Sequence, residues 1–258
     1  MKKMTKRQII TILVTLLTIV LNVLANALPF NGQGTGAISD RFTILFVPAG
    51  YVFSIWGLIY IGLIAFTVFQ ALNSQRENAL LDQIAPAYWV ANIANNVWLF
   101  LWHWEYFPLT LVVMIAILAS LLTLYLQFGK ITLPLTTAEK WLVKVPFSIY
   151  LGWVSVASIA NISQVLFYLG WNGFGMSPVV WTVIMLAVAA LLGILMLLRE
   201  KNFSYAAVLI WAFIGIAVKQ AATPTVLYTA WAAAGVVAAT GLITLGLKNR
   251  KFKKLLKL

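Results

Sequence analysis

The sequence is built from long apolar stretches that carry almost no charge. A helix needs about 20 apolar residues to cross a hydrocarbon layer roughly 30 Å thick, and eight stretches approach this length. Backbone groups in lipid must bond to one another, so we expect these stretches to be helices rather than strands. The chain is therefore predicted to be all-α, a polytopic membrane bundle of about eight helices. The predicted spans are residues 9–28, 50–72, 88–106, 108–128, 145–168, 178–198, 204–219 and 225–247.

The composition argues against a soluble protein of this length. Hydrophobic residues make up 62% of the chain and charged residues 9%. A soluble globular protein carries about 25% charged residues. So few polar side chains could not cover the surface of a soluble fold.

The distribution of positive charge predicts the orientation of the spans. With the N-terminus inside and eight crossings, all of the 18 Lys and Arg except Arg41 and Lys219 fall on the inner side. Cytoplasmic loops of membrane proteins carry such an excess of Lys and Arg. We therefore expect both termini in the cytoplasm, in a multi-pass protein of a bacterial inner or plasma membrane.

The net charge of +12 does not indicate a nucleic-acid partner. The basic residues stand in short runs beside apolar stretches, and not along an element that could track phosphates. We expect them to contact lipid headgroups of the bilayer instead.

The first apolar stretch allows two interpretations. Positive residues, an apolar run and Ala25-Asn26-Ala27 resemble a signal peptide with a small-residue cleavage site. The run is longer than the usual core of a signal peptide. We therefore favour an N-terminal helix that is retained.

Residues for conventional catalysis or metal binding are scarce. The sequence has no Cys, one His and six Asp or Glu, which excludes disulfides and thiolate chemistry. His103 has no evident Ser partner, so a nucleophile–base pair is not indicated. We predict no catalytic residue and no metal site, and we do not expect a conventional enzyme.

Amide side chains inside the spans are candidate functional groups, because polar groups in lipid usually face protein or water. Asn92, Asn95 and Asn96 share one face of the third predicted span. Such amides either fix packing through interhelical hydrogen bonds or line a cavity as polar anchors. The pattern alone leaves both roles open.

Three Trp residues are set deep in three different predicted spans: Trp56, Trp98 and Trp153. A single deep Trp more often serves packing. Three of them could sandwich a flat ligand between their aromatic faces.

Three motifs carry a family resemblance. Residues 47–60, which include Tyr51, Trp56 and Tyr60, are similar to Pro-Pro-x-Trp-Val-Phe-x-x-x-Trp-x-x-x-Tyr. Asn95-Asn96-Val97-Trp98 is similar to Leu-Asn-x-x-Trp. The third motif, Tyr-x-x-Trp-x-x-x-Ala-x-x-x-Asn, is matched in spacing by Tyr150, Trp153, Ala157 and Asn161. In this order the motifs resemble the TspO/MBR family, the tryptophan-rich sensory proteins related to the mitochondrial translocator protein.

The resemblance implies a division of the chain. It covers residues 1–168 and implies a five-helix bundle there, with residues 169–258 as additional helices and a basic cytoplasmic tail. Tyr51 stands where the family usually has Trp. Because family members normally end after five helices, the family's dimer is not assumed, and a homo-oligomer stays open.

The resemblance also implies a ligand. Family members bind tetrapyrroles such as protoporphyrin IX or haem in an outer pocket, lidded by the loop after the first helix. Sterol binding and light-dependent porphyrin degradation are also known in the family. Carried over motif by motif, the ligand-binding residues are Tyr51, Trp56, Tyr60, Asn95, Trp98, Trp153, Ala157 and Asn161.

Two functions follow as hypotheses. The first is a membrane sensory or binding protein, a receptor with an aromatic pocket for a flat hydrophobic ligand, such as a porphyrin or haem. The second is a transporter or permease of a small neutral or lipophilic solute, which the number of spans and the amides within them motivate. The spans hold no carboxylate at their centres, which argues against ion coupling through this chain.

Overall fold

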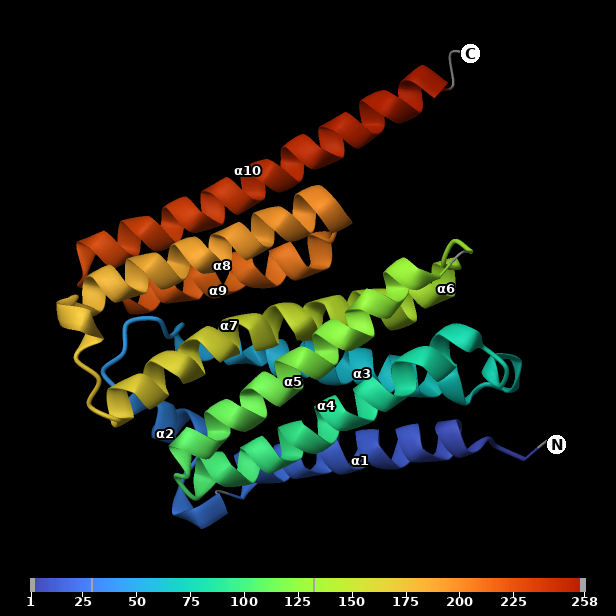
Figure 1. Cartoon of the computed structure of the whole chain (residues 1–258), viewed down its shortest axis with the longest axis horizontal. Coiled ribbons are helices and arrows are strands. Elements are labelled where there is room, and N and C mark those ends of the chain that lie inside the picture. The colour runs from blue at the N-terminus through green and yellow to red at the C-terminus, as the bar shows by residue number, and fades with distance from the viewer. Residues whose placement is uncertain (1–2, 29, 132, 256–258) are drawn as a thin grey trace. The chain divides into compact units, whose positions relative to one another are not determined.

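The computed structural model describes residues 3–28, 30–131 and 133–255 (Figure 1). In these ranges the chain is helical and has no strand, which confirms the all-α prediction. Eight long helices of this described part correspond to the eight predicted spans. They are α1 (Lys6–Ala27), α3 (Ile55–Ala71), α4 (Ala79–His103), α5 (Phe107–Gln127), α7 (Val145–Tyr168), α8 (Pro178–Glu200), α9 (Phe203–Lys219) and α10 (Pro224–Leu255).

Within the described residues, six helical stretches are long and apolar enough to cross a membrane. They contain α1, α3, α5, α7, α8 and α10, with mean hydropathy between 1.5 and 2.7. The apolar helix α9 is shorter, at 17 residues. Helix α4 has 25 residues but carries Asp82 and three Asn, which lower its hydropathy. The chain is thus a multi-pass helical membrane protein, and its orientation stays a prediction.

Local sequence explains where the helices begin. Thr5 and Gln8 form a capping box at the start of α1, in which each side chain bonds the other's backbone N–H. The side chain of Asn78 accepts hydrogen bonds from the backbone N–H groups of Leu80 and Leu81, so α4 begins at Ala79. This helix therefore starts nine residues before the predicted third span.

The helix of the fifth span is also longer than its apolar stretch. A short helix, α6 (Thr137–Glu139), leads through a π-helical turn at Lys140–Lys144 into α7. Pro146 lies at the start of α7 and cannot donate to a carbonyl in the preceding turn. A π turn is one way for a continuous helix to accommodate such a missing bond.

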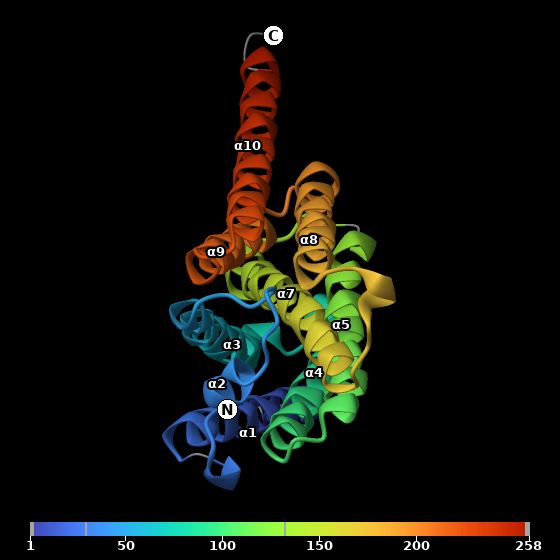
Figure 2. The ribbon, with the colours of Figure 1, turned by 90° about the vertical axis from the view of Figure 1, so that its left-hand side faces the viewer.

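The chain forms two compact units, which we describe separately. The first comprises Met1–Thr43 and Ser54–Gly170. Its five long helices form a closed ring of neighbours: α1 packs on α3, α3 on α7, α7 on α5, α5 on α4, and α4 on α1 (Figures 1 and 2). Apolar side chains such as Leu13 and Leu17 of α1 point outward, where acyl chains would contact them. The three Asn side chains of α4 are buried, as are Asn161 and Gln164 of α7.

The second unit comprises Ile44–Phe53 and Trp171–Leu258. Helices α8, α9 and α10 pack on one another, and small residues allow their close approach. A Cβ at Gly193 of α8 would lie 3.2 Å from Leu209 and 3.3 Å from Val237. The segment Ile44–Phe53 belongs to this unit although it precedes α3 in the sequence.

Candidate functional site

Four aromatic side chains converge between α3 and α7. Trp56 and Tyr60 lie one turn apart on α3, with ring centroids 5.6 Å apart and planes 24° from parallel. Trp56 also meets Tyr150 and Trp153 of α7 edge to face, at 6.0 Å and 6.4 Å. Tyr150 and Trp153 are buried, whereas Trp56 and Tyr60 are half-buried. We call these four residues the aromatic cluster.

A hydrogen-bonded chain links α4, α7 and α5. Trp98 donates from Nε1 to Oδ1 of Asn161 over 3.5 Å, at the long end of the range for such a bond. Asn161 donates from Nδ2 to Oγ1 of Thr110 at 3.0 Å, and Thr110 donates to the carbonyl of Phe107. Both polar atoms of Asn161 therefore have protein partners, as expected of a residue that fixes packing.

A second set of polar contacts joins α1 to α4. Asn22 donates to Oδ1 of Asn95 at 3.0 Å, and Asn96 donates to Oγ1 of Thr18 at 3.2 Å. Asn92 donates to the carbonyl of Tyr88 in its own helix. The side-chain oxygens of Asn92 and Asn96 are buried and have no hydrogen-bond partner among the described residues. A buried amide oxygen of this kind is able to accept a bond from water or a ligand.

Residues 30–43 cover one end of the first unit, and we call them the cap segment. Ile38 and Phe42 pack with Trp102 and Phe107 in one apolar cluster. Trp102 also stacks on Trp98, with centroids 5.1 Å apart and planes 15° from parallel. The loop after the first helix thus packs on the same helix end as Trp98.

Polar contacts fix the cap segment further. Trp102 donates from Nε1 to the carbonyl of Thr35 at 3.2 Å, and Gln164 of α7 donates to Ser39 at 3.3 Å. Gln33 and Arg41 both donate to Glu105, each at 2.9 Å. These two bonds hold the pKa of Glu105 below its ordinary value of 4.5. Glu105 has a left-handed backbone, with φ of 63°, at the turn between α4 and α5.

His103 is a structural residue in this arrangement. Its Nδ1 lies 2.8 Å from the carbonyl oxygen of Leu99, so Nδ1 carries the hydrogen. Its Nε2 lies 3.2 Å from the hydroxyl oxygen of Thr35, within hydrogen-bond distance. The ring is fully buried, and both nitrogens are engaged. In the described part of the chain, no three His, Cys, Asp or Glu side chains gather as a metal site would require.

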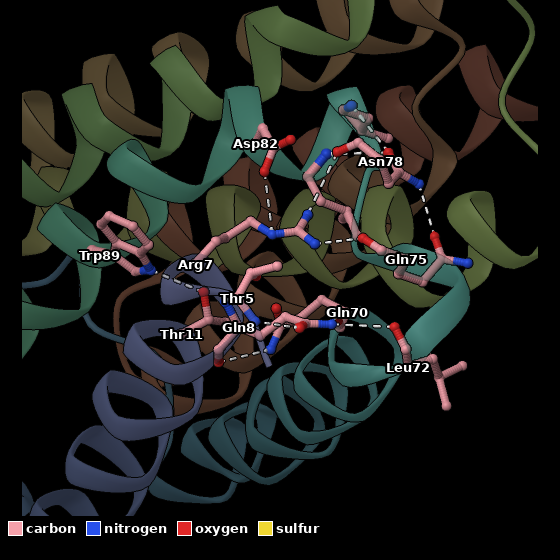
Figure 3. Close-up of polar contacts among 12 residues, drawn as sticks. Thr5, Arg7, Gln8, Thr11, Gln70, Leu72, Gln75, Asn78, Asp82 and Trp89 are labelled. Atoms are coloured by element: carbon pink, nitrogen blue, oxygen red, sulfur yellow. Dashed lines mark hydrogen bonds and ion pairs between the residues drawn. The ribbon is translucent and has the colours of Figure 1, made fainter. Parts of the chain in front are cut away.

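A buried polar cluster lies around Arg7, near the start of α1 (Figure 3). Arg7 is 8% exposed, donates to the carbonyl oxygens of Gln75 and Asn78, and pairs with Asp82 at 3.3 Å. Beside it, Gln8 donates to the carbonyls of Gln70 and Leu72 at 3.0 and 3.2 Å. The side chains of Arg7 and Gln8 therefore bond to free backbone carbonyls at the end of α3 and in the turn before α4.

This cluster was missed by sequence reasoning. The N-terminal cations are expected to set the orientation and to contact lipid headgroups, which does not distinguish Arg7 from its neighbours. A signal was present in Thr5-x-x-Gln8, the capping box that fixes the start of α1 and so its rotation.

The structure divides the predicted ligand residues among several places. Trp56, Tyr60 and Trp153 come together in the aromatic cluster, and Trp98 meets Asn161. Asn95 instead pairs with Asn22 of α1. The structure does not join these three groups by any described contact. Ala157 is half-buried on α7, one turn after Trp153.

Tyr51 belongs to the second unit, where its ring packs edge to face on Trp211 of α9, with centroids 5.3 Å apart. Trp211 had not been predicted as a site residue. The sequence gives no signal for this pair, because 160 positions separate the two residues.

Comparison with known proteins gives one family. No curated protein and no solved structure matches the chain. The model of the family described as TSPO-like protein matches residues 8–243. The resemblance in the motifs extended to residue 168, whereas this match continues through α8 and α9 and into α10. On this match, the chain belongs to the TSPO-like protein family.

Proposed function

We propose that this membrane protein binds a flat hydrophobic ligand, with a tetrapyrrole such as protoporphyrin IX or haem as the candidate class. The family and the helical membrane bundle support a binding or sensory protein in general terms. The single observation that supports the ligand class is the aromatic cluster. The two half-buried rings, Trp56 and Tyr60, are stacked, and two buried rings contact Trp56 edge to face.

The geometry of the cluster suits an extended aromatic ligand. Aromatic rings favour offset-stacked and edge-to-face contacts at centroid distances of about 4.5–7 Å. Trp56 makes both kinds of contact with its neighbours, which fixes its plane before any ligand arrives. A site that is ordered in advance loses less conformational entropy on binding. Trp56 is therefore the expected stacking partner.

The direct test is a titration of the purified protein with protoporphyrin IX, followed by quenching of Trp fluorescence. We expect saturable quenching in the wild type and much weaker binding in the Trp56→Ala, Trp153→Ala double variant. Trp231→Ala is the matched control, because this exposed Trp lies on α10, outside the first unit. Equal quenching in the double variant and the wild type would falsify the proposal.

A transporter remains the second candidate, and the buried oxygens of Asn92 and Asn96 favour it. These two amide oxygens have no hydrogen-bond partner among the described residues, and inside the ring of helices they could bind a small solute transiently during transport. Uptake into proteoliposomes separates the two functions. Binding of protoporphyrin IX without flux of this ligand or of small neutral solutes removes the transporter.

A further inference from the structure

The face that α1 turns toward the rest of the first unit is polar. From Gln8 onward its buried residues recur every three or four positions, so they share one face of the helix. All but the last are polar: Arg7, Gln8, Thr11, Thr15, Thr18, Asn22 and Ala25. Polar groups at membrane depth are costly unless they face protein or water. We call the contact of this face with α3 and α4 the polar seam.

The hydrogen-bond donors around Thr15 are all committed to acceptors of the seam. Thr15 donates its single hydroxyl hydrogen to the carbonyl of Thr11 at 2.7 Å. The hydroxyls of Thr67 and Tyr88 lie 2.9 Å and 2.6 Å from the hydroxyl oxygen of Thr15, so both must donate to it. Trp89 donates from Nε1 to the hydroxyl oxygen of Thr11 at 2.9 Å (Figure 3). This part of the seam therefore has no hydroxyl hydrogen left for further acceptors.

Three amide side chains of the seam nevertheless have a free oxygen. Gln70, Asn92 and Asn96 are 1%, 0% and 6% exposed, and their side-chain oxygens have no hydrogen-bond partner among the described residues. The NH2 groups of Gln70 and Asn92 face backbone carbonyls, at 3.3 Å and 2.9 Å. Turning either amide round would place two oxygens against each other. The free group of each is therefore an acceptor.

The free oxygens specify the chemistry of their missing partner. Each needs a hydrogen-bond donor, since a buried acceptor without one costs about 1–3 kcal/mol. A cation at this depth would need a carboxylate nearby. Asp82 is 57% exposed and lies ten positions before Asn92 on α4, about 15 Å along the helix. The partner is therefore a neutral donor.

The size of the donor follows from the contacts around it. Asn22 bonds Asn95 at 3.0 Å and Asn96 bonds Thr18 at 3.2 Å, so α1 and α4 are in direct contact beside the free oxygens. A large ligand would have to separate these helices. Buried water, which forms about three hydrogen bonds with otherwise unpaired polar groups, is small enough. Asn92 and Asn96 lie on adjacent turns, about 6 Å apart along α4, so waters on the two oxygens could also bond to each other.

We propose that the polar seam is a binding site for water, and that water molecules donate to the free oxygens of Gln70, Asn92 and Asn96. The site lies entirely within the first unit. It is independent of ligand binding by the aromatic cluster and of transport. A solute that bound to Asn92 and Asn96 would have to displace this water and replace its hydrogen bonds.

Water-edited solid-state NMR of the full chain in lipid nanodiscs tests the proposal on the wild type. The measurement follows the transfer of magnetisation from water to side-chain carbons. We expect the side-chain carbonyl carbons of Gln70, Asn92 and Asn96 to receive it several-fold faster than the methyl carbons of Ile117. Ile117 is the dry reference, because it is 1% exposed and lies on α5, outside the seam. Transfer to the three amides as slow as to Ile117 would overturn the proposal.

The stability of Asn92→Leu provides a second test, because the proposal fixes the sign of its effect. Leu is close to Asn in size but has no oxygen. If water bonds to Asn92, the substitution removes this bond, and we expect the unfolding equilibrium constant to rise by about fivefold. Asn95→Leu is the matched variant, since the oxygen of Asn95 has a protein donor in Asn22. An Asn92→Leu protein more stable than the wild type would mean that the oxygen had no partner to lose, and would overturn the water site.

Discussion

The indole of Trp98 and the amide of Asn161 connect α4 to α7, with the indole N–H directed at the amide oxygen. The same amide donates a hydrogen bond to Thr110 of α5. One amide thereby ties three helices of the first unit together. This arrangement gives the packing role of Asn161 a measurable consequence.

Asn161→Ala should destabilise the first unit by about 1 kcal/mol, because interhelical hydrogen bonds in membranes contribute about 0.6 kcal/mol each and two are lost. Unfolding in mixed micelles at increasing denaturant measures this difference. Asn26→Ala is the control, since Asn26 donates to a carbonyl of its own helix. Equal stability of the two variants would contradict the packing role.

Two variants of the aromatic cluster should distinguish an effect on ligand affinity from an effect on stability. Trp153 is 3% exposed, so Trp153→Ala leaves a cavity and should lower both thermal stability and affinity for protoporphyrin IX. Trp56 is only half-buried, and Trp56→Ala should lower affinity by about tenfold with a smaller loss of stability. Thermal unfolding and titration of the same samples provide both values. The interpretation fails if Trp56→Ala is as unstable as Trp153→Ala but binds normally.

Arg7 should contribute more to stability than its carboxylate partner. Arg7→Ala leaves the carbonyls of Gln75 and Asn78 without their donor, so we expect a loss of about 1–3 kcal/mol. Asp82 is 57% exposed, and Asp82→Asn should cost at most about 1 kcal/mol. Chemical unfolding of both variants, with Lys6→Ala as a control of charge alone, tests this order. The reverse order would show that the ion pair is the main contribution.

Glu105 should make the cap segment sensitive to acid. Its pKa in the folded protein is lowered, so its contribution to stability is complete above pH 4.5 and is lost as the pH falls through the folded pKa. We expect hydrogen exchange of residues 33–41 to increase over this range in the wild type. The pair of Arg41 with Glu105 is largely exposed, so the effect should also weaken at high salt.

Glu105→Gln is the matched variant for this experiment. It keeps the shape of the side chain but has no carboxyl group to titrate, so exchange in the cap segment should be nearly independent of pH. An identical acid response in Glu105→Gln and the wild type would assign the response to another group.

The positions of the helices followed from the sequence because length and apolar character decide what crosses a bilayer. The start of α4 did not follow in the same way. The prediction placed it at Tyr88, where the apolar run begins, whereas the cap at Asn78 starts the helix at Ala79. Capping is a property of a few polar residues that hydropathy does not register.

The candidate site was predictable only where its residues are neighbours on one helix. Trp56 and Tyr60 are four positions apart, so their shared face follows from helical geometry. Which helix meets that face depends on how each helix is rotated about its axis, and this is set by packing between helices. The partners of Asn95 and Tyr51 could not be deduced for this reason.

The segment Ile44–Phe53 has a consequence for the order in which the second unit is completed during synthesis. Val52 is synthesised 159 residues before Trp211, its partner on α9. The buried side chains Phe46 and Val47 leave the ribosome equally early. Until the rest of the second unit has been synthesised, these apolar side chains are exposed, and exposed apolar surface promotes aggregation. A chain cut after α7 would lack the rest of the second unit, so we expect it to aggregate more readily than the whole chain.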